Sequence, residues 1–269
     1  MEWFEALILG LVQGLTEFLP VSSSGHLMIA RELLGVDAEG FLDFTVTVHF
    51  ATVLSTIVVF WASIVQIIKG VFKFRYNDET DYFLKLCLSM VPVAAVGFFF
   101  KDKVESLFGD DLGTVGVCLL ITAALLLLSQ IITVKHPVEN KHRNGISFLQ
   151  AFLVGIGQAC AVAPGLSRSG TTIATGLLSG VKKDNMAQFS FLMVLVPIIG
   201  EQLLDLIDVA QGEVALGSGV GVLPLVCGFF SAFLAGLFAC KVMIGIVRKA
   251  RFSWFALYCA VVGIILLVL

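Results

Sequence analysis

Long apolar stretches, each close to the length of a membrane-crossing helix, constrain this 269-residue chain more than any other feature. A helix needs about 20 predominantly apolar residues to cross the hydrocarbon core of a bilayer. Six stretches approach or exceed this length: 41–69, 82–100, 112–133, 186–209, 218–247 and 253–269. Charged tracts separate most of them, as expected of loops outside the membrane. The chain is therefore predicted to be an all-α polytopic membrane protein.

Composition excludes two other classes of protein. Hydrophobic residues make up 58% of the chain and charged residues 14%, whereas soluble domains average about 25% charged residues. A lone soluble domain does not need so much apolar surface. The formal net charge is −3 and no long basic tract occurs, so nucleic acid is not an expected partner. Membrane lipids are the expected surroundings.

Two further apolar regions, 3–35 and 146–181, are each interrupted near the middle. Proline, serine and glycine occur at 19–26 in the first region and at 163–172 in the second. Neither half of either region is long enough to span a bilayer, and irregular backbone at membrane depth is tolerated only against protein or a water-filled cavity. Each region is therefore predicted to be a re-entrant hairpin, in which two short helices are joined by a loop inside the membrane.

The two interrupted regions align without gaps at an offset of 145 residues, so that Ser22 matches Ser167. Nine positions are identical, where chance would give roughly two to three. The full spans follow the same offset, which predicts two repeats, 1–133 and 146–269, each with one hairpin followed by three spans. Three is an odd number, so the second repeat is expected to be inverted relative to the first. Residues 1–269 would form one integral membrane domain.

The distribution of lysine and arginine predicts which side of the protein faces the cytoplasm. Loops 69–81, 134–145, 182–185 and 248–252 lie on one side and hold eleven of these residues, whereas the other side holds three. Cytoplasmic loops carry the excess of positive charge in membrane proteins. The side with eleven is therefore predicted to be cytoplasmic, so both termini and the first hairpin face the outer side.

Three ionisable residues lie in or beside the predicted loops of the two hairpins. Glu17 and His26 flank the first loop, and Arg168 lies in the second. An ionisable group inside a membrane costs about 2.5–3.5 kcal/mol on insertion scales, so each needs a functional or structural reason. The repeat places both loops near one point at the middle of the membrane.

Oxygen ligands and anion-binding groups meet at the same predicted point. Gln13 and Glu17 lie four residues apart on one helical face and supply oxygen ligands of the kind that Mg²⁺ or Ca²⁺ prefers. A helix starts after each loop, helix N-termini bind anions, and the donors of Arg168 match phosphate oxygens. The remaining candidate substrate-binding residues are Ser22, Ser24, Gly25, Ser167, Ser169, Gly170 and Thr172. This set suits a phosphate or diphosphate group, whose transfer depends mostly on positioning and charge neutralisation.

Structural roles remain open for these groups. A glutamate–arginine pair can hold two helices together, an interior histidine can be satisfied by its neighbours, and serines are common where membrane helices pack. His49 lies deeper in a span lined by threonines, and its role is left open between structure and function. Three more ionisable residues, Glu201, Asp205 and Lys241, are expected to reach the membrane interface.

The two loops resemble the two signatures of the undecaprenyl-diphosphate phosphatase family, also known as the bacitracin-resistance proteins. Residues 14–20 and 22–26 carry the first signature, and Pro164, Gly165 and 167–170 carry the second. The length and the pattern of spans also fit this family, so the resemblance extends over essentially the whole chain.

This resemblance implies an activity and a site. The activity is removal of the terminal phosphate of undecaprenyl diphosphate, which recycles the lipid carrier of peptidoglycan synthesis in the bacterial plasma (inner) membrane. The resemblance also implies a site that opens to the outer (periplasmic) side, a divalent cation, and Glu17, His26 and Arg168 as the functional core. The first signature of the family begins with Glu or Gln, and here it begins with the neutral Gln13.

The residues leave the mechanism and one competing function open. Ser23 could attack the terminal phosphorus with His26 as its base, or His26 could attack directly or activate water. Ser23 is favoured because a hydroxyl beside an imidazole is a usual activated pair. A polyprenyl-phosphate flippase or an anion transporter would use the same Arg168, but anion passage alone has little need of the carboxylate of Glu17. Whether two chains form a homodimer is also left open.

Overall fold

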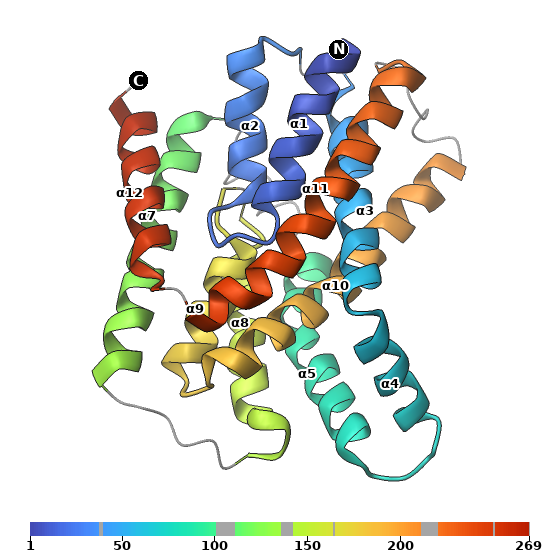
Figure 1. Cartoon of the computed structure of the whole chain (residues 1–269), viewed down its shortest axis with the longest axis vertical. Helices are drawn as coiled ribbons and strands as arrows, with labels where there is room; N and C mark the ends of the chain where they lie inside the picture. Colours follow the sequence, from blue (N-terminus) through green and yellow to red (C-terminus); the bar gives the residue numbers. More distant parts are fainter. Residues whose placement is uncertain are drawn as a thin grey trace.

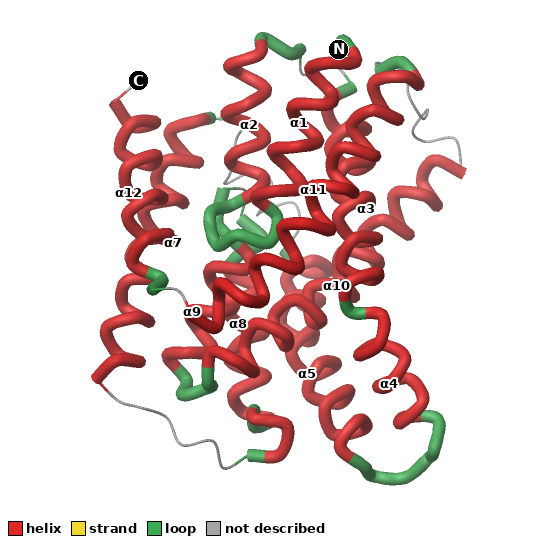
Figure 2. The backbone as a smooth tube through the Cα atoms, in the orientation of Figure 1, coloured by secondary structure: helices red, strands yellow, loops and turns green. Residues whose placement is uncertain are grey.

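The structure is a computed structural model of the chain, and all of its regular secondary structure in the described residues is helical (Figures 1 and 2). It describes residues 1–37, 40–100, 111–135, 142–163, 165–210, 220–249 and 251–268. Pro164 of the second signature and the side chains of Glu201 and Asp205 lie outside the described part. The expectation that Glu201 and Asp205 reach the interface therefore stays a prediction.

The described helices follow the order of the predicted hairpins and spans. In the first half they are α1 (Trp3–Thr16), α2 (Ser23–Leu34), α3 (Phe41–Val59), α4 (Trp61–Val71), α5 (Asp78–Phe99) and α7 (Leu112–Lys135). In the second half they are the 3₁₀ turn η1 (Arg143–Gly145), α8 (Phe148–Cys160), α9 (Arg168–Leu178), α10 (Lys183–Ala210), α11 (Val222–Lys249) and α12 (Ser253–Val268).

Several of these helices are long and apolar enough to cross a membrane, as a multi-pass membrane protein requires. Helices α5, α7 and α11 meet this condition individually, and α3 and α4 meet it together. The stretch 41–69, expected as one span, is thus two helices bent by 72°. The bend falls at Phe60, a buried residue whose ring packs 6.1 Å from that of Phe191 in α10, so core packing holds the break in place.

The two hairpins enter the molecule from opposite ends. Helices α1 and α2 descend from the end that carries the N-terminus, whereas α8 and α9 rise from the other end (Figure 1). The loops that join each pair lie near mid-height, where Figure 2 shows them close together. Each hairpin thus brings irregular backbone and the N-terminus of a helix into the interior, surrounded by protein as such backbone requires.

Glycines allow the first helix of each hairpin to pack closely against a spanning helix. A Cβ atom added to Gly10 of α1 would lie 2.4 Å from the carbonyl oxygen of Gly228 in α11. A Cβ atom added to Gly155 of α8 would lie 2.2 Å from the carbonyl oxygen of Ser89 in α5. Both distances are too short for any side chain. Small residues at such contacts let membrane helices approach backbone to backbone.

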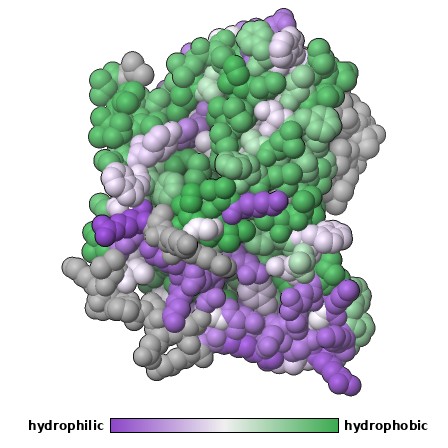
Figure 3. All heavy atoms as spheres, viewed as in Figure 1, coloured by the Kyte–Doolittle hydropathy of each residue, from purple (hydrophilic) through white to green (hydrophobic). Residues whose placement is uncertain are grey.

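The outer surface divides into an apolar region and a polar end. Figure 3 shows hydrophobic side chains over most of the visible face, with hydrophilic side chains gathered at the end where α4 joins α5. At this polar end the buried Lys85 donates to Asp81 at 2.5 Å and to the carbonyl oxygen of Arg143 at 2.9 Å. The bond to Arg143 fastens α5 to the segment that leads into the second hairpin.

Candidate active site between the two hairpins

The same serine cap begins the second helix of each hairpin. Ser22 caps α2, and its hydroxyl oxygen accepts a hydrogen bond from the backbone N–H of Gly25 at 3.2 Å. Ser167 caps α9 and accepts from the N–H of Gly170 at 3.0 Å. An N-cap serine satisfies one of the otherwise unpaired N–H groups of the first turn. The remaining N–H groups and the positive ends of both helix dipoles are suited to anions.

The two hairpin tips are hydrogen-bonded to each other. The backbone N–H of Gly165 in the second tip donates to the hydroxyl of Ser24 in the first, at 3.4 Å. In the opposite direction, the hydroxyl of Ser169 donates to the carbonyl oxygen of Leu19 at 3.0 Å. Residues about 150 positions apart thus form one polar site, as the repeat predicted.

Glu17, at the end of α1, is the centre of this site. One carboxylate oxygen accepts a hydrogen bond from Arg168 at 3.2 Å, and the two side chains are 10% and 28% exposed. The other oxygen accepts from the hydroxyl of Ser23 at 2.5 Å and from the side-chain amide of Gln13 at 2.8 Å. A ring nitrogen of His49 in α3 lies 3.9 Å from that second oxygen. Removing the cationic partner would leave a buried carboxylate uncompensated.

The structure pairs Ser23 with Glu17, whereas the sequence suggested His26 as its base. One ring nitrogen of His26, Nδ1, lies 2.8 Å from the backbone carbonyl oxygen of Ser22. Its other ring nitrogen, Nε2, lies 2.7 Å from the hydroxyl of Tyr258 in α12. His26 begins the second turn of α2, and neither of its ring nitrogens is bonded to Ser23. Ser23 therefore has Glu17 as its immediate proton acceptor.

The backbone of Ser22 is strained. Its φ angle is +69°, a value that residues with a side chain rarely adopt. The carbonyl oxygen of this residue also accepts the backbone N–H of His26 at 3.1 Å. Such strain costs of order 1–3 kcal/mol and gathers at functional sites, where the surrounding structure holds it.

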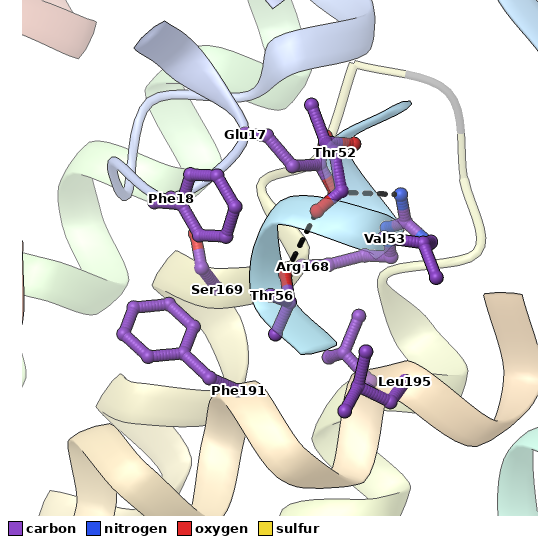
Figure 4. Close-up of a pocket in the computed structure, with 10 residues that line it drawn as sticks. Glu17, Phe18, Thr52, Val53, Thr56, Arg168, Ser169, Phe191 and Leu195 are labelled. Atoms are coloured by element: carbon purple, nitrogen blue, oxygen red, sulfur yellow. Dashed lines mark hydrogen bonds and ion pairs between the residues drawn. The ribbon is translucent and has the colours of Figure 1, made fainter. Parts of the chain in front are cut away.

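Two small cavities share the Glu17–Arg168 pair. A polar cavity of about 20 Å³ is lined by serines of both loops: Ser22, Ser23, Ser24, Ser167 and Ser169. An adjoining cavity of about 30 Å³ is mostly apolar and includes Phe18, Phe191 and Leu195, with Thr52 and Thr56 of α3 (Figure 4). The ion pair thus lies between a hydroxyl-rich space and an apolar one.

The glycines of the two loops make room for α7. Added Cβ atoms on Gly25 and Gly170 would lie 2.8 Å from Val115 and 3.1 Å from Thr122, both in α7.

Thr172, expected to bind substrate, faces away from the site. Its hydroxyl donates to the carbonyl oxygen of Arg168 and lies 2.6 Å from the hydroxyl of Ser190 in α10. Thr172 therefore joins α9 to α10 and does not line either described cavity.

Two residues of the site were not identified from the sequence. The sequence does not decide the role of His49, and its threonine-rich surroundings are the only signal. Tyr258 gives no signal, because a single tyrosine in an apolar helix is not by itself a mark of a site. Conversely, the contacts between the two hairpins could be anticipated from the repeat alone.

Fold and site together define a class of protein: a multi-pass membrane protein with a buried polar site where two helical hairpins meet. Comparison with known sequences gives the family. The model of the bacitracin resistance protein BacA family matches residues 6–265, and this chain belongs to that family.

Named relatives match the chain along its whole length. An undecaprenyl-diphosphatase of Bacteroides fragilis is 53% identical over 268 residues, which cover 100% of this chain and 98% of the relative. The protein of the same name from Bacteroides thetaiotaomicron is 52% identical, with 100% and 99% covered. A more distant one, from Carboxydothermus hydrogenoformans, is 38% identical, with 100% and 98% covered.

Proposed function

We propose that this protein hydrolyses the terminal phosphate of undecaprenyl diphosphate, releasing undecaprenyl phosphate and inorganic phosphate. The observation that carries the proposal is the Glu17–Arg168–Ser23 cluster, in which both hairpins contribute to one site of a chain of the BacA family. A guanidinium, two helix N-termini and several hydroxyls can bind a diphosphate. The carboxylate beside them is a group that hydrolysis needs and anion passage does not.

The linings of the two adjoining cavities suit an amphiphilic substrate, and because the cavities of about 20 and 30 Å³ each hold only a water or two, they would have to widen around it. The hydroxyl-rich cavity offers hydrogen bonds to phosphate oxygens, and the cavity next to Phe18 and Phe191 offers an apolar surface. A polyprenyl diphosphate has a charged end and a hydrocarbon chain directly bonded to it. The diphosphate would lie among the serines, against Arg168, and the prenyl chain would leave between helices into the lipid.

In the proposed reaction Ser23 attacks the terminal phosphorus. Its proton passes to Glu17, the oxygen–phosphorus bond to Ser23 forms, and the bond to the bridging oxygen breaks, so that undecaprenyl phosphate leaves. Water then attacks the phosphoserine: its proton passes to His26 Nε2, which gives up its bond to the Tyr258 hydroxyl to accept it, and from there to solvent. The bond to Ser23 breaks, Glu17 returns the proton to its hydroxyl, and inorganic phosphate leaves. Arg168 offsets the negative charge that the transferring group carries throughout.

A divalent cation is part of this proposal. Among the described residues, no group of three or more His, Cys, Asp and Glu side chains is arranged so that it could hold a metal ion. Glu17 and Gln13 are the protein ligands we propose, and the side-chain oxygen of Gln13 is buried and has no hydrogen-bond partner among the described residues. Mg²⁺ is commonly held by one or two carboxylates together with substrate phosphates, which fits this donor set better than an all-protein Ca²⁺ cage. The cation would supply further positive charge against the diphosphate.

We also propose that the halves are inverted repeats and that the site opens to the outer side of the bacterial inner membrane. The matching serine caps and the entry of the hairpins from opposite ends support the repeat. The lysine and arginine count supports the orientation. One chain supplies all the proposed site residues, so the proposal requires no homodimer.

Phosphate release by the full-length protein in detergent tests the function. Wild type should release phosphate from a polyprenyl diphosphate, EDTA should abolish release, and added Mg²⁺ should restore it. Glu17→Gln should reduce release by about 10²-fold or more. Glu32→Gln, which changes an exposed carboxylate on the same hairpin, is the matched control and should behave as wild type. A folded wild type that releases no phosphate with any of several divalent cations would count against hydrolysis and favour lipid or anion transport.

A further inference from the structure

We propose that Ser22 is a positioning residue for the reaction, because its left-handed backbone brings Glu17 and Ser23 together. The inference rests on the proposed phosphatase function and gives a role to a conformation that the proposed mechanism does not use. It starts from a difference between the two hairpin tips, which share a serine cap but not its backbone: φ is +69° at Ser22 and −70° at Ser167.

The two tips make their left-handed turn at different residues. The second tip makes it at Gly165, where φ is +86° and the missing Cβ makes such a value ordinary. The first tip has Pro20 at the matching position, and the ring of proline excludes a positive φ. The turn falls instead on Ser22, the only non-glycine residue with a positive φ among the described residues of either tip. A side chain thus stands where glycine would fit better, a conflict that is typical of functional positions.

The φ angle of Ser22 sets the direction from which the chain arrives at α2. The ψ angles of the two caps are similar, 96° at Ser22 and 112° at Ser167, so each helix leaves its cap in nearly the same way. Because φ is the rotation about the N–Cα bond, its value turns the preceding loop relative to the helix. In the first tip this loop brings Glu17 to within 2.5 Å of the Ser23 hydroxyl. In the second tip the residue that matches Glu17 is Val162, which has no group to accept a proton.

Neighbouring groups hold Ser22 in this conformation. Its carbonyl oxygen accepts the backbone N–H of His26 at 3.1 Å, and the ring nitrogen Nδ1 of the same residue lies 2.8 Å away. Its hydroxyl accepts from the N–H of Gly25, and the residue is 3% exposed. The carbonyl oxygen of Ser167 accepts the N–H of Thr171 at 2.8 Å, but Thr171 has no ring to add a second bond. The imidazole bond is thus specific to the tip whose backbone is strained.

Paired substitutions by glycine and alanine separate the effect of the backbone from that of the hydroxyl. Both remove the hydroxyl and its cap, and they differ in the Cβ atom, which favours alanine at negative φ and glycine at positive φ. Ser22→Gly should therefore unfold at a temperature about 2–4 °C above that of Ser22→Ala. The order should reverse in the matched control pair, so that Ser167→Ala unfolds at a higher temperature than Ser167→Gly.

The kinetic consequence concerns kcat. Loss of the cap loosens Ser22, and in Ser22→Ala the Cβ then favours a negative φ, which would draw Glu17 away from Ser23. The kcat of folded Ser22→Ala should be about 10-fold below that of Ser22→Gly, and their KM values should agree within about twofold, because both lack the same hydroxyl. Ser22→Pro, whose ring fixes φ near −65°, should lower kcat by about 10²-fold or more. At Ser167 glycine should have no advantage over alanine in kcat.

Initial rates and thermal unfolding in detergent decide the inference. Equal kcat in folded Ser22→Gly and Ser22→Ala would overturn it, since a merely structural role changes the stability of the protein and not the rate of its folded form. The same order of unfolding temperatures at Ser22 and at Ser167 would overturn it as well. A wild type without phosphatase activity would instead overturn the proposed function, and the unfolding comparison would still decide whether the backbones of the two caps differ.

Discussion

The two hairpins have the same scaffold and different chemistry. Each consists of two short helices, and in each a serine caps the second helix through an N–H three residues on. At three matching positions the first hairpin has Glu17, Ser23 and His26, and the second has Val162, Arg168 and Thr171. The two hairpins therefore present similar helix N-termini, and the differences between them supply the ionisable groups of the cluster.

The division of charge between the hairpins has a physical reason. Two carboxylates at one buried point would repel each other, and two guanidinium groups would do the same. With a carboxylate on one tip and a guanidinium on the other, at 3.2 Å, each compensates the burial of the other. An asymmetric site on a repeated scaffold can hold an anion beside a proton acceptor, which two identical tips could not.

The largest expected effect is on phosphate release, when Arg168 is removed. This is the only charged side chain that the second hairpin contributes to this cluster. Arg168→Ala should reduce phosphate release by about 10³-fold or more, because the charge of the transferring group loses its main protein counter-charge. Arg168→Lys should recover only a small part of this loss, since an ammonium lacks the planar pair of donors.

Steady-state kinetics on folded, detergent-purified protein measure the effect of Arg168→Ala. Arg143→Ala, which removes an arginine paired with Asp78 at the polar end, is the control and should remain active. Near-normal turnover in folded Arg168→Ala would mean that the site lies elsewhere.

The second prediction compares serines of the two tips. Ser23→Ala should lower kcat by roughly 10²-fold, because water activated by Glu17 would have to replace the hydroxyl as nucleophile. Ser169→Ala should cost only a few-fold, since its hydroxyl bonds to the backbone of Leu19 and not to the carboxylate. Initial rates at saturating substrate distinguish the two. Equal losses would contradict the assignment of Ser23 as the attacking group.

The third prediction concerns packing, where the hairpins should behave alike. Gly10→Ala and Gly155→Ala should each destabilise the protein by about 1–3 kcal/mol, because the new methyl group meets a backbone carbonyl in both cases. Gly97→Ala is the control, since no atom lies within 4 Å of its added Cβ. Thermal unfolding in detergent measures the three variants. A large difference between Gly10→Ala and Gly155→Ala would break the structural equivalence of the hairpins.

The smallest expected effect is at the start of the second hairpin. Ser147 caps α8, where its hydroxyl accepts from the backbone N–H of Gln150 at 3.1 Å. Ser147→Ala should lower the free energy of unfolding by about 1 kcal/mol, the usual cost of losing an N-cap. Phosphate release should stay within twofold of wild type, because Ser147 is remote from the hairpin tip. Lost activity without lost stability would show that the cap has a further role.

Much of the site could be anticipated from local pattern and symmetry. Glu17 and Arg168 stood out because ionisable groups are rare in apolar segments, and the repeat indicated that their loops meet. The pairing of Ser23 could not be anticipated, because His26 is three residues away in sequence but its ring is turned toward Ser22 and Tyr258. Thr172 was expected at the substrate for its place in the loop motif, yet its side chain faces α10.

The sequence by itself determined the membrane class, the helical content and the position of the two broken hairpins, because hydropathy and helix-breaking residues act over a few turns of one segment. It also indicated which charged groups had to find partners. Only the tertiary structure decided which partners these are: the bend at Phe60, the contact of Ser23 with Glu17 and the approach of Tyr258 to His26. Each depends on side-chain direction and on the packing of helices distant in sequence, which no local pattern encodes.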